Sequence, residues 1–178
     1  VPKYLMFLPG SRAIRSLPEV YKMALSAELV VSLDSATYER TGLHNYFVNP
    51  SFHPKFINID HHHDNPEYGT LNYIKADSSS TSEIIYHILP RLAAEINPQV
   101  ATCLLNGIFF DTGSFQNPNT SIQTLKITSD LLALGASLRE VTTNNLKNKS
   151  LGTLRLWGKI LSRIKRNKKW GIVSTMVT

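Results

Sequence analysis

Two short apolar runs, each ending in an aspartate, predict buried β-strands in the first third of the chain. Residues 28–34 read Glu-Leu-Val-Val-Ser-Leu-Asp, and residues 55–60 read Lys-Phe-Ile-Asn-Ile-Asp. Both runs are short, rich in β-branched or aromatic residues, and bounded by polar clusters, as buried strands are. Ligands of open parallel sheets bind beyond the carboxyl ends of the strands. The pattern therefore predicts that Asp34 and Asp60 lie at one rim of the sheet.

Helix signals separate and follow these strands. Capping boxes, or a capping residue with proline in the first turn, occur at residues 16–19, 80–83, 97–98, 120–123 and 137–140. We expect the second helix to break at Pro90 and the third to end on Asp111. Gly135 separates the last two. Strands that alternate with helices predict an α/β fold, in which helices cover both faces of a parallel sheet.

The last part of the chain combines an apolar stripe with a basic run. Leu154, Trp157, Leu161 and Ile164 share one helical face, and we expect Leu154 and Trp157 in the core rather than in a base-stacking platform. Residues 165–169 follow as a basic run. Residues 170–178 look like a strand that begins without a partner and is cut short.

Composition fits one water-soluble domain. The 178 residues are 42% hydrophobic and 18% charged, which is enough for one sizeable core. No apolar run approaches the roughly 18 residues that a membrane span needs. The single cysteine, Cys103, cannot form an internal disulfide. We expect a cytoplasmic protein without a membrane partner.

The positive charge is concentrated at the end of the chain. The net charge is +6, yet no acidic residue follows Glu140, whereas nine basic residues do. A solvated helix face with a polar linker and a patch for polyanions both fit this pattern. We predict a hinge toward a second domain rather than a self-standing RNA site.

The sequence Asn-Ile-Asp-His-His-His-Asp-Asn at residues 58–65 is the sharpest chemical feature. Imidazole nitrogens and carboxylate oxygens suit Mn²⁺, Zn²⁺ or Fe²⁺, although a histidine run on a loop can also be plain surface. Taken alone, Asp34 fits a helix cap or a turn residue, and Asp111 must be paired, bound to metal or at a surface turn. Together these residues offer the ligands of a hydrolytic metal site.

Four stretches together resemble the DHH family of phosphoesterases, within the RecJ-like superfamily. They are residues 31–35 with Arg40 and Gly42, residues 58–62 with Asn65, residues 70–86 and residues 107–115. The chain is most similar to the nano-RNase branch, small oligoribonucleases that also act as 3′-phosphoadenosine 5′-phosphate phosphatases. The similarity runs from about Tyr4 to Thr178.

The resemblance implies a Rossmann-like domain with a two-manganese centre. Asp34 would bridge both Mn²⁺ ions, and His61 and Asp111 would complete the ligands of the second ion. Asp60 would orient its neighbour, and His62 would face the substrate phosphate. A bridging hydroxide would attack phosphorus in line. Arg40 could hold a phosphate, although a surface ion pair explains it equally well.

The family's first motif, His-x-x-x-Asp-x-Asp, and its smaller C-terminal domain with a Gly-Gly-Gly-His segment are not found in this chain. We expect truncation at both ends, with residues 1–164 as the catalytic domain and residues 165–178 as a basic linker and the start of a missing substrate-binding domain. A degenerate, inactive homologue is the alternative. This chain alone, with ligands for about one ion, should hydrolyse phosphoesters poorly, whereas its full-length parent should be a Mn²⁺-dependent enzyme that could form a homodimer.

Three functions compete. The first is a phosphoesterase that acts on short RNA or on 3′-phosphoadenosine 5′-phosphate. The second is a hydrolase of the same family that acts on cyclic dinucleotides, single-stranded DNA or polyphosphate. The third is a nucleotide-binding module that has lost catalysis.

Overall fold

The computed structural model describes residues 1–24, 26–44, 54–147 and 150–176. The helices and strands of the described residues are, in chain order, α1 (Leu17–Ala24), β1 (Leu29–Leu33), β2 (Lys55–Asp60), β3 (Leu71–Ile74), α3 (Thr81–Arg91), α4 (Pro98–Asp111), α5 (Ile122–Ala133), α6 (Leu138–Thr142), α7 (Leu151–Ser162), β4 (Lys165–Asn167) and β5 (Ile172–Ser174). Short helical turns add η1 (Lys3–Leu5), η2 (Ser11–Ala13), η3 (Glu39–Thr41) and η4 (Thr143–Lys147).

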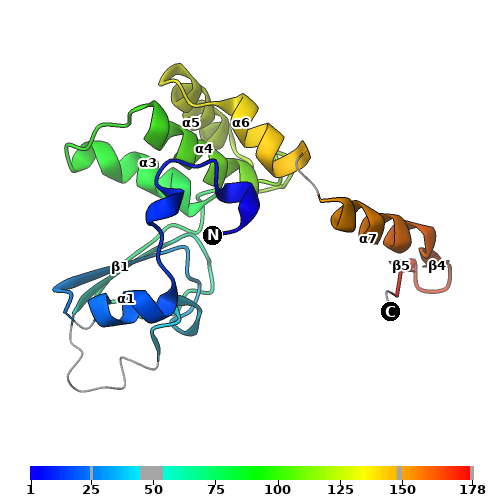
Figure 1. The fold of residues 1–178 in the computed structure, drawn as a ribbon, viewed down its shortest axis with the longest axis horizontal. Coiled ribbons are helices and arrows are strands. Elements are labelled where there is room, and N and C mark those ends of the chain that lie inside the picture. Colours follow the sequence, from blue (N-terminus) through cyan, green and yellow to red (C-terminus); the bar gives the residue numbers. More distant parts are fainter. Residues whose placement is uncertain (25, 45–53, 148–149, 177–178) are drawn as a thin grey trace.

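A parallel sheet in the order β1-β2-β3 confirms the predicted α/β fold. Both predicted strands are present, and their register pairs Leu33 with Ile59. The third strand was not predicted from periodicity, because Leu-Asn-Tyr-Ile is short and interrupted by an amide. Figure 1 shows α1 beside the sheet, and α3 to α6 gathered beyond it.

The helix starts follow the predicted caps with one correction. The side chains of Ser80, Asn97 and Ser137 accept hydrogen bonds from the first turns of α3, α4 and α6. The cap of α5 is Ser121, which forms its capping box with Thr124, so the predicted box at residues 120–123 is one position early. Helix α3 contains Pro90 and ends at Arg91, one residue beyond the expected break.

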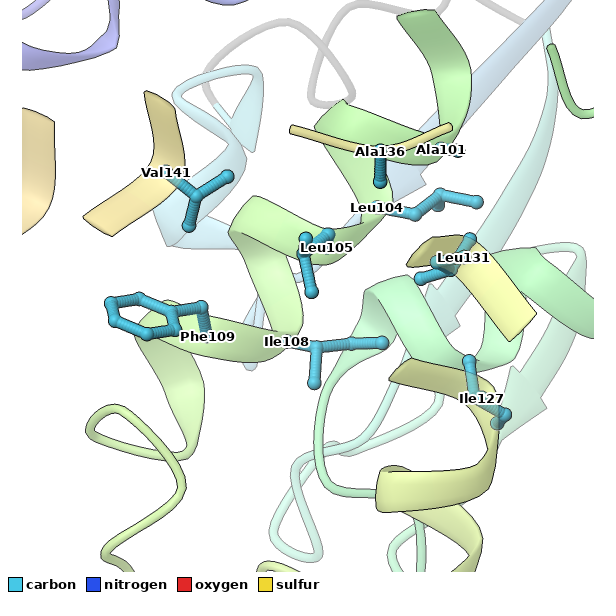
Figure 2. Packing of buried hydrophobic residues seen from close by; sticks show 9 residues of the cluster. All are labelled: Ala101, Leu104, Leu105, Ile108, Phe109, Ile127, Leu131, Ala136 and Val141. Carbon is cyan, nitrogen blue, oxygen red and sulfur yellow. The ribbon is translucent and has the colours of Figure 1, made fainter. Parts of the chain in front are cut away.

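The main core lies around α4 (Figure 2). This helix packs against α3, α5 and α6, so apolar side chains around much of its surface are buried. The buried cluster consists of Ala101, Leu104, Leu105, Ile108, Phe109, Ile127, Leu131, Ala136 and Val141. A smaller cluster of Ala24, Leu43 and Phe56 joins α1 to β2. These two clusters pack the sheet and the helical layer, and this packing fixes the residues at the junction of the two layers.

Helix α7 and the β4–β5 hairpin stand clear of the rest in Figure 1. None of the residues of α7 is buried, and Leu154 and Trp157 are 50% and 48% exposed, so the prediction that they lie in the core is wrong. Strand β5 pairs antiparallel with β4, which lies in the basic run. The predicted final strand therefore has a partner, although its last residues, 177 and 178, lie outside the described residues. The domain boundary at residue 164 stays a prediction.

Within the described residues, no helix combines the length and apolar character that crossing a membrane requires.

Gly107 allows α3 and α4 to approach closely. A Cβ atom built on Gly107 would lie 2.9 Å from Ser82 Cβ and would also collide with Ser82 Oγ. We predict that Gly107→Ala lowers the free energy of unfolding by about 1–3 kcal/mol, because the two helices must move apart. Gly158→Ala in α7 is the matched control, since nothing lies within 4 Å of the new atom. In chemical denaturation, the free energy of unfolding of Gly158→Ala should equal that of the wild-type chain or exceed it by up to about 1 kcal/mol. Equal stability of the two variants would contradict this packing.

Candidate metal site

The carboxyl ends of β1 and β2 place Asp34 and Asp60 side by side, as the sequence predicts. The Asp34 N–H donates to the Ile59 carbonyl at 3.1 Å, which extends the ladder to the last positions of the strands. Asp34 then adopts a left-handed φ of 60°. Thr81, at the start of α3, donates its hydroxyl to Asp34 Oδ1 at 2.9 Å. The amino end of α3 also favours a carboxylate through its partial positive charge.

His61 has one ring nitrogen held by the backbone and the other aimed at two carboxylates. Nδ1 lies 3.3 Å from the Ser78 carbonyl oxygen. A carbonyl can only accept, so Nδ1 carries a proton, and Nε2 is left with a free lone pair in the neutral ring. Nε2 lies 3.5 Å from Asp34 Oδ1 and 3.8 Å from Asp111 Oδ2, too far for good hydrogen bonds.

Asp60 is fully buried and anchors the loop that carries the histidines. Its Oδ1 accepts from the His61 backbone N–H at 2.8 Å and lies 2.7 Å from His62 Nδ1. Its Oδ2 accepts from Asn65 Nδ2 at 2.6 Å. Burial alone would raise the pKa of Asp60, but the hydrogen bonds from His62, Asn65 and His61 outweigh it and lower the pKa. Asp60 therefore holds the imidazole of His62, while the Ser78 carbonyl holds that of His61.

Asp111 ends α4 as predicted and faces the same space. Burial is the main cause that raises its pKa, and the Asp34 carboxylate raises it further, while His61 and His62 oppose the change. The two carboxylates thus repel each other across the Nε2 atom of His61. A divalent cation between them would remove this repulsion.

The donor set fits a divalent metal ion. Ligand atoms that share one ion at about 2.0–2.2 Å are roughly 3–3.5 Å apart, and the distances from His61 Nε2 are close to this. Ligand atoms of Asp34, Asp60, His61 and His62 also lie within 4.8 Å of one another. Asp111 is outside that group of four, and its Oδ2 lies 3.8 Å from His61 Nε2. Oxygen and imidazole donors of this kind suit borderline divalent ions.

Arg40 does not join this cluster through any contact. It lies in η3 and is exposed, and in the part of the chain that the structure describes it forms no ion pair. The surface ion pair considered for Arg40 is therefore not observed. A cleft of about 260 Å³ borders the cluster at Asp34 and Asp111, with Leu33, Gly107 and Phe110 among its lining residues.

Several supporting residues were not predicted from the sequence. Buried Asn58 of β2 donates to Asn65 Oδ1 at 2.9 Å and to Asn72 Oδ1 of β3 at 3.1 Å, and Asn65 in turn donates to Asp60. An amide inside an apolar strand signals a buried polar network, because an unpaired amide is costly there. The roles of Ser78 and Thr81 depend on the path of the chain after β3, which the sequence pattern did not reveal.

We predict that Asp111→Asn stabilises the metal-free chain at neutral pH. A carboxyl whose folded pKa is raised contributes stability below its ordinary value of 3.8, and this contribution is lost as the pH rises through the folded pKa. Thermal unfolding in the presence of a chelator should therefore give a higher unfolding temperature for the variant than for the wild-type chain at pH 7. The difference between the two temperatures should shrink toward pH 4. A variant less stable than wild type at pH 7 would contradict the repulsion between Asp34 and Asp111.

Comparison with known proteins places these residues in a family. Residues 2–108 match the DHH family, N-terminal domain. The bifunctional oligoribonuclease and PAP phosphatase NrnA of Thermus thermophilus is 32% identical over 163 residues, which cover 92% of this chain and 47% of that protein. The protein of the same name from Bacillus subtilis is 32% identical over 159 residues, which cover 88% of this chain and 49% of that protein.

A solved structure supports the same relationship. The crystal structure of an exopolyphosphatase-related protein from Bacteroides fragilis has a TM-score of 0.84 and 26% identity, covering 95% of this chain and 51% of that one. The chain thus spans about half the length of the curated relatives it matches. The family match includes Asp34 and the loop with Asp60, His61 and His62. On this evidence the chain belongs to the DHH family.

Proposed function

We propose that this chain is the metal-binding part of a phosphoesterase that hydrolyses short oligoribonucleotides and 3′-phosphoadenosine 5′-phosphate. The observation that carries the proposal is the convergence of Asp34, His61 and Asp111 around one point at the rim of the sheet. The names of the relatives, which describe an oligoribonuclease and a PAP phosphatase, support this choice of substrate. Substrates, metal and partners of the whole protein are all part of the proposal, as is a homodimer.

Asp34, His61 and Asp111 would hold Mn²⁺. When bound, the metal would make a water molecule acidic and would neutralise negative charge on the phosphate. The Ser78 carbonyl fixes the tautomer of His61, because it keeps the proton on Nδ1 and leaves Nε2 free to bind the metal. Thr81 holds one oxygen of Asp34 in place.

His62 would bind the substrate phosphate. Asp60 accepts from Nδ1 and fixes the ring, and the His62 side chain is 33% exposed, so a substrate can reach it. When the ring is protonated, Nε2 carries a hydrogen that it can donate to a phosphate oxygen. Asp60 would therefore act through His62 and through the His61 backbone. Arg40 is a second candidate for holding a phosphate.

A polyphosphate hydrolase of the same family is the second candidate function. The observation that favours it is the similarity in fold to the exopolyphosphatase-related protein from Bacteroides fragilis. Both substrates would present a phosphate group to the same metal site, so an assay must decide between them. A nucleotide-binding module without catalysis is the alternative from another functional class.

We predict that the chain binds Mn²⁺ and that Asp34→Asn, His61→Gln and Asp111→Asn each weaken binding at least tenfold, because each removes one ligand. His62→Gln should leave the dissociation constant nearly unchanged, since we assign this ring to the phosphate. Titration of the chain with Mn²⁺, followed by the electron paramagnetic resonance signal of the free ion, measures these constants.

Asp64→Asn is the matched control, because Asp64 lies on the same loop, is exposed and is outside the cluster. Wild-type affinity is expected for this control. Loss of affinity in His62→Gln comparable to that in His61→Gln would make His62 a ligand and would overturn its assignment to the substrate.

We predict slow hydrolysis by the 178-residue chain alone. Two-metal catalysis needs ligands for a second ion, and the described residues offer a set for about one. The assay follows release of mononucleotides from a dinucleotide and of phosphate from 3′-phosphoadenosine 5′-phosphate, both with Mn²⁺. The NrnA protein of Thermus thermophilus, assayed in parallel, serves as the positive control.

The turnover of this chain should be at least a hundredfold lower than that of the control. Turnover equal to the control would contradict the need for further ligands. Faster release of phosphate from polyphosphate than from either nucleotide would replace the first candidate function by the second.

A further inference from the structure

We infer that Asn119 and the buried carboxylate of Glu83 are positioning residues that lock the His61 side of the metal site to its Asp111 side. The inference rests on the proposed function, because it takes His61 and Asp111 as metal ligands. Neither Asn119 nor Glu83 contacts the ligand atoms themselves. Both act on the backbone that carries or holds those ligands.

Asn119 bridges two segments that are far apart in the sequence. Its Nδ2 donates to the Ser79 carbonyl at 3.0 Å and to the Asp111 carbonyl at 3.3 Å. An amide NH₂ group has two hydrogens, so one side chain can make both bonds. Asn119 lies between α4 and α5, whereas Ser79 lies between β3 and α3. The bridge therefore fixes the end of α4 against the start of α3.

The Ser79 end of this bridge is connected to His61. The preceding carbonyl, that of Ser78, accepts from His61 Nδ1 at 3.3 Å. The Ser78 carbonyl shares its rigid peptide plane with the Ser79 N–H, which Glu83 holds, and this plane meets the plane of the Ser79 carbonyl at the Ser79 Cα atom. The orientation of the imidazole and the position of Asp111 thus depend on the same short segment.

Glu83 anchors that segment from the inside. Its side chain is 4% exposed, and Oε2 accepts from Ser79 N–H at 3.2 Å, from Ser79 Oγ at 2.6 Å and from Thr124 Oγ1 at 3.2 Å. A predicted capping box would direct Glu83 to the N–H of Ser80, but the carboxylate reaches one residue further back. Within the described ranges no lysine or arginine pairs with it. Three neutral donors therefore bind Oε2 of this buried carboxylate, which lowers the cost of burying it.

The return of the chain toward Asp111 requires an unusual backbone. Gly113, Ser114 and Phe115 have φ values of 54°, 64° and 64°. Left-handed residues other than glycine cost roughly 1–2 kcal/mol each. After this turn, Asn117 and Asn119 both reach the Asp111 carbonyl, and only Asn119 also reaches Ser79. Strained backbone of this kind is found where a segment positions functional residues and not where it stabilises the fold. We therefore assign residues 113–115 to positioning the site.

The test compares Mn²⁺ dissociation constants of Asn119→Ala and Asn117→Ala. Both variants lose one hydrogen bond to the Asp111 carbonyl, but only Asn119→Ala breaks the link to Ser79. Residues that orient metal ligands typically change affinity by about 10–100-fold when removed. We expect Asn119→Ala to weaken Mn²⁺ binding about tenfold or more, and Asn117→Ala to weaken it less than threefold.

Glu83 is tested with two variants. Glu83→Gln keeps an oxygen that can accept from Ser79 and Thr124, so its affinity for Mn²⁺ should stay within threefold of wild type. Glu83→Ala leaves these donors unpaired and should weaken binding at least tenfold. Circular dichroism at the assay temperature identifies variants that are folded, and Asn119→Ala carries the test if Glu83→Ala does not fold.

The outcomes separate this inference from the proposed function. If Asn119→Ala lowers the unfolding temperature of the metal-free chain but binds Mn²⁺ as tightly as wild type, its role is structural and the inference is wrong. If the wild-type chain binds no Mn²⁺, the proposed metal site fails, and the inference fails with it. Equal weakening in Asn119→Ala and Asn117→Ala would also overturn it.

Discussion

The parallel register of β1 and β2 is the constraint on which the site depends. Pairing of Leu33 with Ile59 places Asp34 and Asp60 at the same height on the rim. A slip of one residue would turn each side chain of the strand to the opposite face of the sheet. The inward face of β2 is fixed by buried Phe56, Asn58 and Asp60, and this burial makes a slip costly. The core around α4 then presents Asp111 to the same point.

Electrostatics explains why this point suits a cation. The Asp34 and Asp111 carboxylates both face His61, and burial with mutual repulsion raises the pKa of Asp111. Asp60, by contrast, is less exposed than Asp34 and Asp111, but hydrogen bonds from His62, Asn65 and His61 lower its pKa. Hydrogen-bond donors of the loop therefore satisfy Asp60, while Asp34 and Asp111 face each other and would share a positive charge. This difference separates the residue that organises the loop from the residues assigned to the metal.

The sequence predicted β1, β2, most helix starts and the rim that carries the site, because these follow from local periodicity and capping residues. Asp34 and His61 were found for the same reason, since each directly follows or ends a buried strand. The bridge made by Asn119 could not be predicted, because it joins segments 40 residues apart. The exposure of Trp157 could not be predicted either, since an amphipathic helix indicates an apolar partner but not where that partner lies.

Anomalous diffraction at the manganese edge, from crystals of the chain grown with Mn²⁺, locates the ion together with its ligands. We predict a peak at about 2.0–2.2 Å from one oxygen of Asp34, one oxygen of Asp111 and Nε2 of His61, with Nδ1 of His61 still on the Ser78 carbonyl. A peak held by His62 and Asp60 instead, or no peak between Asp34 and Asp111 at saturating Mn²⁺, would contradict this assignment.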